Sequence, residues 1–132
     1  MIENLIQNLI AISLGAMLFF SFVIAPVIFK VLDANNAGKF VRKIFPHYYL
    51  INLIILSITV LLLFYISSVN LHFYITLIIT ILFAFSLFIL MPLINKLKDS
   101  KEEKKFKYSH ALSVLINLIQ IIGLIYLIFY LS

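Results

Sequence analysis

The sequence predicts an all-α integral membrane protein, a four-helix bundle whose antiparallel helices run up, down, up and down. Three observations favour this class. Hydrophobic residues make up 64% of the 132 residues and charged residues only 11%, whereas roughly a quarter of a typical soluble domain is charged. All ten Lys and Arg residues fall in two short windows. The stretches outside these windows are long and apolar, so lipid is the solvent that most of this chain requires.

Four segments reach the length of about 20 apolar residues that a helix needs to cross the hydrocarbon core. Helices fit them better than barrel strands, which alternate in hydrophobicity over about 10 residues. A helix also satisfies its own backbone hydrogen bonds, as lipid requires. The predicted crossings, within a single transmembrane domain of residues 1–132, are 5–29, 48–66, 73–93 and 111–131.

The first crossing carries small residues that favour close packing between helices. Gly15, Ser21 and Ala25 would let a neighbouring helix approach, and Pro26 is expected to kink the helix near its end. A cleaved signal peptide is the alternative interpretation, but the positive n-region that it needs is missing. We therefore expect this helix to be retained.

The connections between the crossings differ in character. Asp33 can cap a short helix of residues 34–45 whose apolar face would lie at the membrane interface, with Pro46 restarting the chain for the second crossing. A short turn at 67–71 makes the second and third crossings antiparallel neighbours. The connection at 95–107 is rich in Lys and reads as a solvated loop.

The two halves of the chain resemble each other. Residues 26–30 (PVIFK) end the first crossing, and residues 92–96 (PLINK) end the third at an offset of 66. Residues 50–54 (LINLI) recur at 115–119 at an offset of 65. This pattern predicts two hairpins related by a parallel two-fold axis, although a sequence rich in Ile and Leu also matches itself easily.

Orientation follows from the distribution of positive charge. The positive-inside rule places the basic loops 30–45 and 95–107 in the cytoplasm. Both termini and the turn at 67–71 then lie outside the cell (inner) membrane. The net charge of +5 is not taken as a sign of nucleic acid binding, because its cations flank the crossings. The expected partners are the lipid bilayer and, as one arrangement, further copies of the chain.

Polar residues inside the membrane are the candidate functional residues. The last crossing carries His110, Ser113, Asn117 and Gln120 on one helical stripe that should face protein. His47 and Asn52 lie at similar depths on the second crossing and would complete a polar pocket. Two interpretations remain open, interhelical hydrogen bonding and a path for a substrate or ion.

His47 and His110 allow a second hypothesis. Each lies near the start of a crossing on the same side of the membrane, and two histidines from different helices could ligate haem iron or a metal. An interfacial belt with Tyr48 and Tyr108 is the alternative. No acidic residue lies inside the crossings to support a ligand and the chain has no Cys, so no metal site or cofactor is predicted.

The order of these features resembles a known family, the bacterial relatives of transmembrane protein 205, four-helix membrane proteins that carry a domain of unknown function. The residues that carry the resemblance are Gly15, Ala25-Pro26-x-x-Phe29, Phe45-Pro46-x-Tyr48-Tyr49 and His110-x-x-Ser113-x-x-x-Asn117. The family pattern has Gly after its histidine, where this chain has Ala111. The resemblance implies the four-helix topology and no particular activity.

Enzyme motifs are absent from the sequence: it has no Gly-rich phosphate loop, no H-E-x-x-H and no G-x-S-x-G. We therefore expect a non-enzymatic multi-pass membrane protein, acting in small-solute transport or as a membrane-accessory component. The alternative is a haem- or metal-binding redox protein that uses His47 and His110.

Overall fold

The computed structural model describes residues 1–131 and confirms the all-α class. Its helices form four continuous spans, each long and apolar enough to cross a membrane. The first span is α1 (Ile2–Phe19), the π-helical turn η1 (Phe20–Ile24) and α2 (Ala25–Val31); the second is α3 (Ala34–Tyr65); the third is α4 (Leu71–Phe85), the π-helical turn η2 (Ser86–Leu90) and α5 (Met91–Asp99); the fourth is α6 (Glu103–Leu131). Ser132, whose side of the membrane was predicted from the sequence, is not among the described residues.

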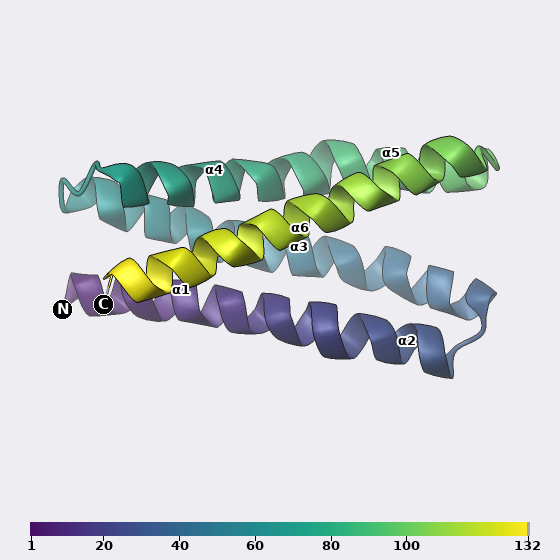
Figure 1. Cartoon of the computed structure of the whole chain (residues 1–132), viewed down its shortest axis with the longest axis horizontal. Helices are drawn as coiled ribbons and strands as arrows, with labels where there is room; N and C mark the ends of the chain where they lie inside the picture. Colours follow the sequence, from purple (N-terminus) through teal and green to yellow (C-terminus); the bar gives the residue numbers. More distant parts are fainter. Residues whose placement is uncertain (132) are drawn as a thin grey trace.

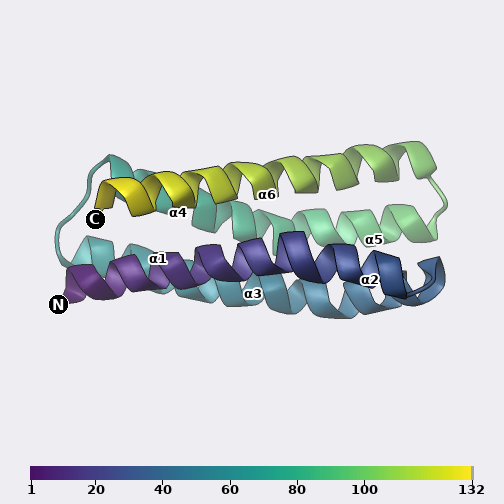
Figure 2. The ribbon, with the colours of Figure 1, turned by 60° about the horizontal axis from the view of Figure 1, so that its bottom comes forward.

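The four spans stand as an antiparallel square (Figures 1 and 2). α1 packs against α3 and α6, and α4 packs against the same two helices. α3 and α6 are therefore diagonally opposite. The start of α1, the end of α6 and the turn at 67–70 lie at one end of the bundle (Figure 1). The other end carries residues 30–43 and 95–107, which hold all ten Lys and Arg, and we call it the basic end.

Asparagine and aspartate side chains start two of the helices. The Asp33 carboxylate accepts a hydrogen bond from the Asn36 backbone N–H at 2.8 Å and caps α3. The Asn70 side chain accepts from the N–H groups of His72 and Phe73 and caps α4. These bonds satisfy donors that a helix start leaves open.

The predicted break between an interfacial helix and the second crossing is wrong. α3 runs without interruption from Ala34 through Pro46 to Tyr65. Proline removes the hydrogen bond that its own N–H would donate and crowds the carbonyl four residues earlier, but the same face of the helix is buried on both sides of it, at Ala37 and at Tyr48. Tertiary packing therefore holds the helix together across the proline.

The two π-helical turns occupy matching places in the two halves. The N–H of Ala25 donates to the Phe20 carbonyl, and the N–H of Met91 donates to the Ser86 carbonyl. Each turn ends two residues before a proline, whose ring would crowd the carbonyl four residues earlier in an α-helix. The wider π turn relieves this contact.

The likeness between the halves extends beyond the π turns. Residues 22–33 and 88–99 share Phe, Pro, Ile, Lys and Asp at an offset of 66. The two hairpins, residues 2–65 and 71–131, thus repeat both a local distortion and the sequence that produces it. The two-fold axis between them stays a prediction.

The interior of the bundle is closely packed and mostly apolar. The largest fully buried side chains include Phe83, Met17, Leu56 and Leu124, one from each span. Between its two ends the outer surface is also apolar, with large side chains such as Phe88 exposed, which suits contact with lipid.

Candidate functional site

Five polar residues in the middle of the bundle are linked by hydrogen bonds, and we call them the polar chain: Ser13, Asn52, Tyr48, Asn117 and Ser21. The link between Asn52 and Tyr48 runs through the backbone carbonyl of Tyr48. The Ser13 hydroxyl donates to Asn52 Oδ1 at 2.7 Å. The Asn52 amide Nδ2 donates to the backbone carbonyl of Tyr48 at 2.8 Å. Asn52 and Ser13 are almost completely buried, so these bonds satisfy groups that could find no water.

The chain continues across the diagonal of the bundle. The Tyr48 hydroxyl, on α3, donates to Asn117 Oδ1, on α6, at 2.6 Å. The Asn117 amide Nδ2 then donates to the Ser21 hydroxyl oxygen in η1 at 3.0 Å. Side chains from the first, second and fourth spans are thereby joined through the bundle axis.

Aromatic packing holds Tyr48 in this position. Its ring stacks on Phe20 with centroids 4.3 Å apart, and Phe83 of the third span meets its edge at 6.2 Å. Both contacts come from buried residues. Because Phe20 and Ser21 both belong to η1, the π turn places the stacking partner and the last member of the polar chain together.

A separate polar contact joins the third and fourth spans. Gln120 is fully buried, and its Nε2 donates to the Ile79 carbonyl at 3.1 Å. Its Oε1 has no hydrogen-bond partner. One turn further along α6, a Cβ added to Gly123 would lie 2.7 Å from Ile79 Cδ1. This glycine permits the close approach of α6 to α4.

The residues of the predicted polar pocket are divided by the structure. Asn52 and Asn117 enter one network, and Gln120 is buried beside α4. Ser113 donates to the carbonyl of His110 on its own helix at 2.7 Å. His47 and His110 are exposed, so the six predicted residues do not line a common pocket.

The two histidines have separate surroundings. The His47 ring Nδ1 is 2.9 Å from the Lys43 carbonyl, and His110 stacks on Phe106 with centroids 5.9 Å apart. They face outward from α3 and α6, which are diagonally opposite. The single chain therefore builds no site from both imidazoles. No group of three or more His, Asp, Glu or Cys residues placed to hold a metal ion occurs in residues 1–131.

The small residues predicted to mediate helix packing behave differently from one another. Ser21 is half-buried and bonds to Asn117, and Ala25 is also half-buried, whereas Pro26 is exposed. Gly15 is exposed and an added Cβ would meet nothing within 4 Å. Close packing at Gly15 does not occur within the single chain, because α1 turns this position outward; Gly123 has that role instead.

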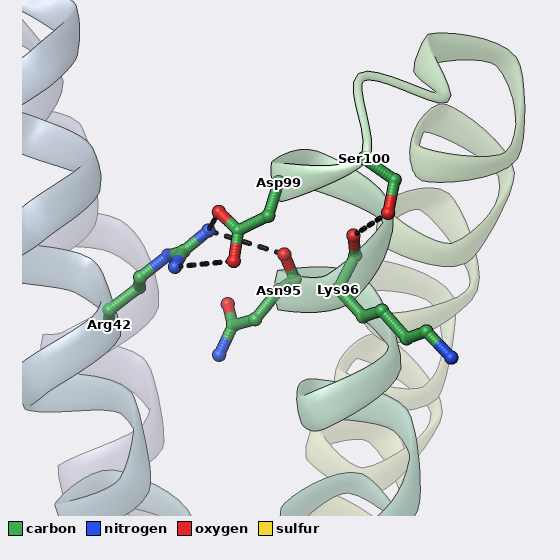
Figure 3. Close-up of polar contacts among 5 residues, drawn as sticks. All are labelled: Arg42, Asn95, Lys96, Asp99 and Ser100. Atoms are coloured by element: carbon green, nitrogen blue, oxygen red, sulfur yellow. Dashed lines mark hydrogen bonds and ion pairs between the residues drawn. The ribbon is translucent and has the colours of Figure 1, made fainter.

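An ion pair closes the basic end between the second and third spans (Figure 3). Arg42 of α3 makes two hydrogen bonds to the Asp99 carboxylate at the end of α5, at 2.5 and 3.1 Å. It also donates to the Asn95 carbonyl at 3.3 Å. Ser100 beside it donates to the Lys96 carbonyl at 2.8 Å. The pair lies where the α3–α4 hairpin is open, far from its turn.

Two depressions lie on the outer surface near the basic end. One of about 260 Å³ is apolar and lies between α3 and η2, lined by Pro46, His47, Leu50, Leu87 and Phe88. The other, of about 320 Å³, lies on α6 and is lined by Lys104, Lys107, Tyr108 and Ala111.

The chain is similar to a family of unknown function and to an uncharacterized bacterial protein. A family model described as a domain of unknown function, DUF4149, matches residues 8–103. An uncharacterized protein of Aquifex aeolicus (strain VF5) is 36% identical over 116 residues, covering 88% of this chain and 86% of that protein. No solved structure matches the chain.

Proposed function

This chain belongs to the DUF4149 family, a domain of unknown function, and from its geometry we propose that it is a non-enzymatic membrane-accessory component. It acts through its lipid-facing surface and its basic end rather than through a path in its interior. The fold supplies four membrane-crossing helices. Membrane insertion is thus the part of the function that its composition and structure already explain.

The observation that carries the proposal is that the polar chain satisfies its own hydrogen bonds. Each of its amide and hydroxyl groups is bonded to another member or to backbone, from Ser13 through Asn52 and Tyr48 to Asn117 and Ser21. A solute path needs polar groups that can exchange partners with the solute. Groups that bond to one another instead fix the helices in one arrangement.

Small-solute transport is the second candidate, and two observations favour it. Gln120 Oε1 is buried without a partner, so it could accept a hydrogen bond from a solute or water. The first and third spans contain π turns, which are frequent at functional sites.

Reconstituted vesicles distinguish the two functions. Proteoliposomes that hold the full chain should release ions and small neutral probes no faster than vesicles without protein. Saturable flux that disappears in Gln120→Leu would establish transport and remove the accessory proposal. Thr59→Val is the matched control, because the Thr59 hydroxyl bonds only to a carbonyl of its own helix.

A cellular test asks which part of the molecule matters. The double variant Tyr48→Phe, Asn117→Leu makes the centre of the polar chain apolar while removing both partners of one bond, so that neither is left unpaired. At equal abundance in the membrane it should restore the defect of a strain that lacks the chain. Failure to restore it would favour transport.

The orientation and relationships of the protein are part of the same proposal. The basic end lies in the cytoplasm and both termini lie outside the inner membrane, which the segregation of all ten Lys and Arg supports.

Further copies of the chain are the proposed protein partner, because Gly15 leaves open space on the outer face of α1. The motif around Pro26, Pro46 and His110 supports a relation to the transmembrane protein 205 family.

A further inference from the structure

The depression on α6 lies at the border between its charged and apolar parts. Lys104, Lys107, Tyr108 and Ala111 line it, and their spacing of three, four and seven residues puts them on one stripe of the helix. Ala111 begins the predicted apolar crossing. The backbone of Lys104 thus lies about two turns, roughly 10 Å along the axis, before the start of the apolar part, and that of Lys107 about one turn, roughly 6 Å.

The two lysines of this stripe have no acidic partner. In the part of the chain that the structure describes, the neighbouring Lys105 pairs with Glu102 at 3.7 Å. Lys104 and Lys107 make no ion pair with any described carboxylate. The depression therefore presents two ammonium groups that form no ion pair.

The repeat relates Lys107 to a cation of the other half that is paired. Asp99 and Arg42 form the ion pair at the basic end. Asp33 corresponds to Asp99 at an offset of 66, and Lys107 corresponds to Arg42 at an offset of 65. Asp33 caps α3 through the Asn36 N–H and makes no pair with Lys107. One half of the molecule uses its acid to neutralise the cation, and the other half leaves the cation available.

We propose that this depression binds the headgroup of an anionic phospholipid. The phosphate lies between the ammonium groups of Lys104 and Lys107, and the Tyr108 hydroxyl donates to a phosphate or ester oxygen. The acyl chain starts over Ala111, where the small side chain leaves room, and continues past Leu115, which is exposed one turn deeper. Phosphate chemistry alone also fits a free ion, but the apolar floor at Ala111 favours a lipid.

Native mass spectrometry of the full chain from lipid nanodiscs tests the proposal. The probes are dioleoyl phosphatidylglycerol and dioleoyl phosphatidylcholine, which share acyl chains and differ in headgroup charge. The protein should retain dioleoyl phosphatidylglycerol in preference to dioleoyl phosphatidylcholine. Lys104→Gln with Lys107→Gln should lower that retention about tenfold or more, because each lysine near a headgroup contributes a several-fold effect.

Matched variants separate this site from general attraction. Lys30→Gln with Lys39→Gln removes the same charge from exposed residues elsewhere at the basic end and should leave retention unchanged. Ala111→Leu keeps both lysines but fills the floor, and it should lower retention, whereas Val114→Leu on another exposed position should not.

Three results would overturn the proposal. Equal losses in the two double variants would mean diffuse attraction to the basic end. Equal retention of the two lipids would mean that no headgroup is recognised. If inorganic phosphate displaces phosphatidylglycerol more than chloride does at the same ionic strength, the ligand is the free ion.

Discussion

Asn52 and Asn117 satisfy a buried amide in different ways. Asn52 donates to a carbonyl of its own helix and accepts from a single serine. Asn117 depends on two side chains from other spans. Asn52 can therefore make one of its two hydrogen bonds within its own helix before the bundle forms. Asn117 can make both of its bonds only after the spans have packed together.

A double-mutant cycle measures the first of these contacts. Ser13→Ala, Asn52→Leu and their combination should give a coupling energy of about 0.6 kcal/mol, up to about 1.7, the range found for hydrogen bonds between membrane helices. Unfolding in mixed micelles supplies the free energies. Thr59→Val paired with Ser13→Ala serves as the control and should show no coupling, since Thr59 bonds only to its own helix.

The two glycines in the apolar spans should respond oppositely to a large side chain. Gly123→Leu should destabilise the bundle by about 1–3 kcal/mol, because it forces α6 away from Ile79. Gly15→Leu should be tolerated by the fold of the single chain, because the space around that position is open within it. Thermal unfolding in detergent compares them. Equal destabilisation would mean that Gly15 also packs closely, against a second copy of the chain.

Of the stripe that the sequence predicted to face protein, Gln120 is buried and Ser113 and Asn117 are half-buried, whereas His110 is exposed. The hydrogen-bond partners of these side chains were not predicted. Polarity indicates which side chains must face protein, but partner choice depends on how each helix is rotated. Tyr48 fits an interfacial belt by its place in the sequence, yet it lies inside the bundle. Its ring is carried inward by stacking on Phe20, a contact across 28 residues that periodicity along one helix does not contain.

At the scale of the elements, proline has two different effects. Before Pro26 and Pro92 the helix widens into a π turn, whereas α3 passes Pro46 as a continuous helix. The sequence predicted a kink at Pro26 and a break at Pro46. The position of a proline determines which hydrogen bond is lost, but the packing around it determines whether the helix widens, bends or continues.

Replacing Pro26 tests whether the π turn serves the polar chain. In Pro26→Ala the crowding that favours η1 is removed, so Ser21 should shift away from Asn117. Ser21→Ala should then cost less stability than it does beside the native proline. Pro92→Ala is the control, because η2 contributes no member of the polar chain, and it should leave the cost of Ser21→Ala unchanged. If Ser21→Ala costs the same stability in the native chain, in Pro26→Ala and in Pro92→Ala, η1 does not determine the position of Ser21.

The Arg42–Asp99 pair should hold the open end of the α3–α4 hairpin. Arg42→Asp should weaken the contact between α3 and α5, and adding Asp99→Arg should restore it in part. Because both side chains are substantially exposed, the effect should be small and should diminish at high salt. Spin-label distances across the basic end measure it. A distance that is unchanged in Arg42→Asp at low salt would contradict this role.

At the scale of the whole molecule, the helices exceed what the bilayer requires. α3 has 32 residues and is about 48 Å long, against a hydrocarbon core of about 30 Å. Its first turns, with Lys39 and Lys43, must therefore extend beyond the core. This explains why the sequence found four crossings but underestimated their lengths: hydropathy detects the part in lipid, and a helix continues where its backbone bonds remain satisfied.

Reporter fusions test the orientation of the molecule. A reporter inserted at Ser100, at the basic end, and one fused to the C-terminus should give opposite answers, with the first in the cytoplasm. Insertion at Ser68, in the turn at the other end, should agree with the C-terminal fusion. A cytoplasmic C-terminus would reverse the arrangement proposed from the segregation of Lys and Arg.

The shared residues of 22–33 and 88–99, with a π turn in each, also bear on the origin of the protein. Duplication of a gene for one helical hairpin would explain both the offset of 66 residues between these two segments and the π turn that each contains. The ancestor would have been a chain of half this length that assembled in pairs. Separate synthesis of residues 1–68 and 69–132 would then recreate that ancient dimer from its diverged descendants.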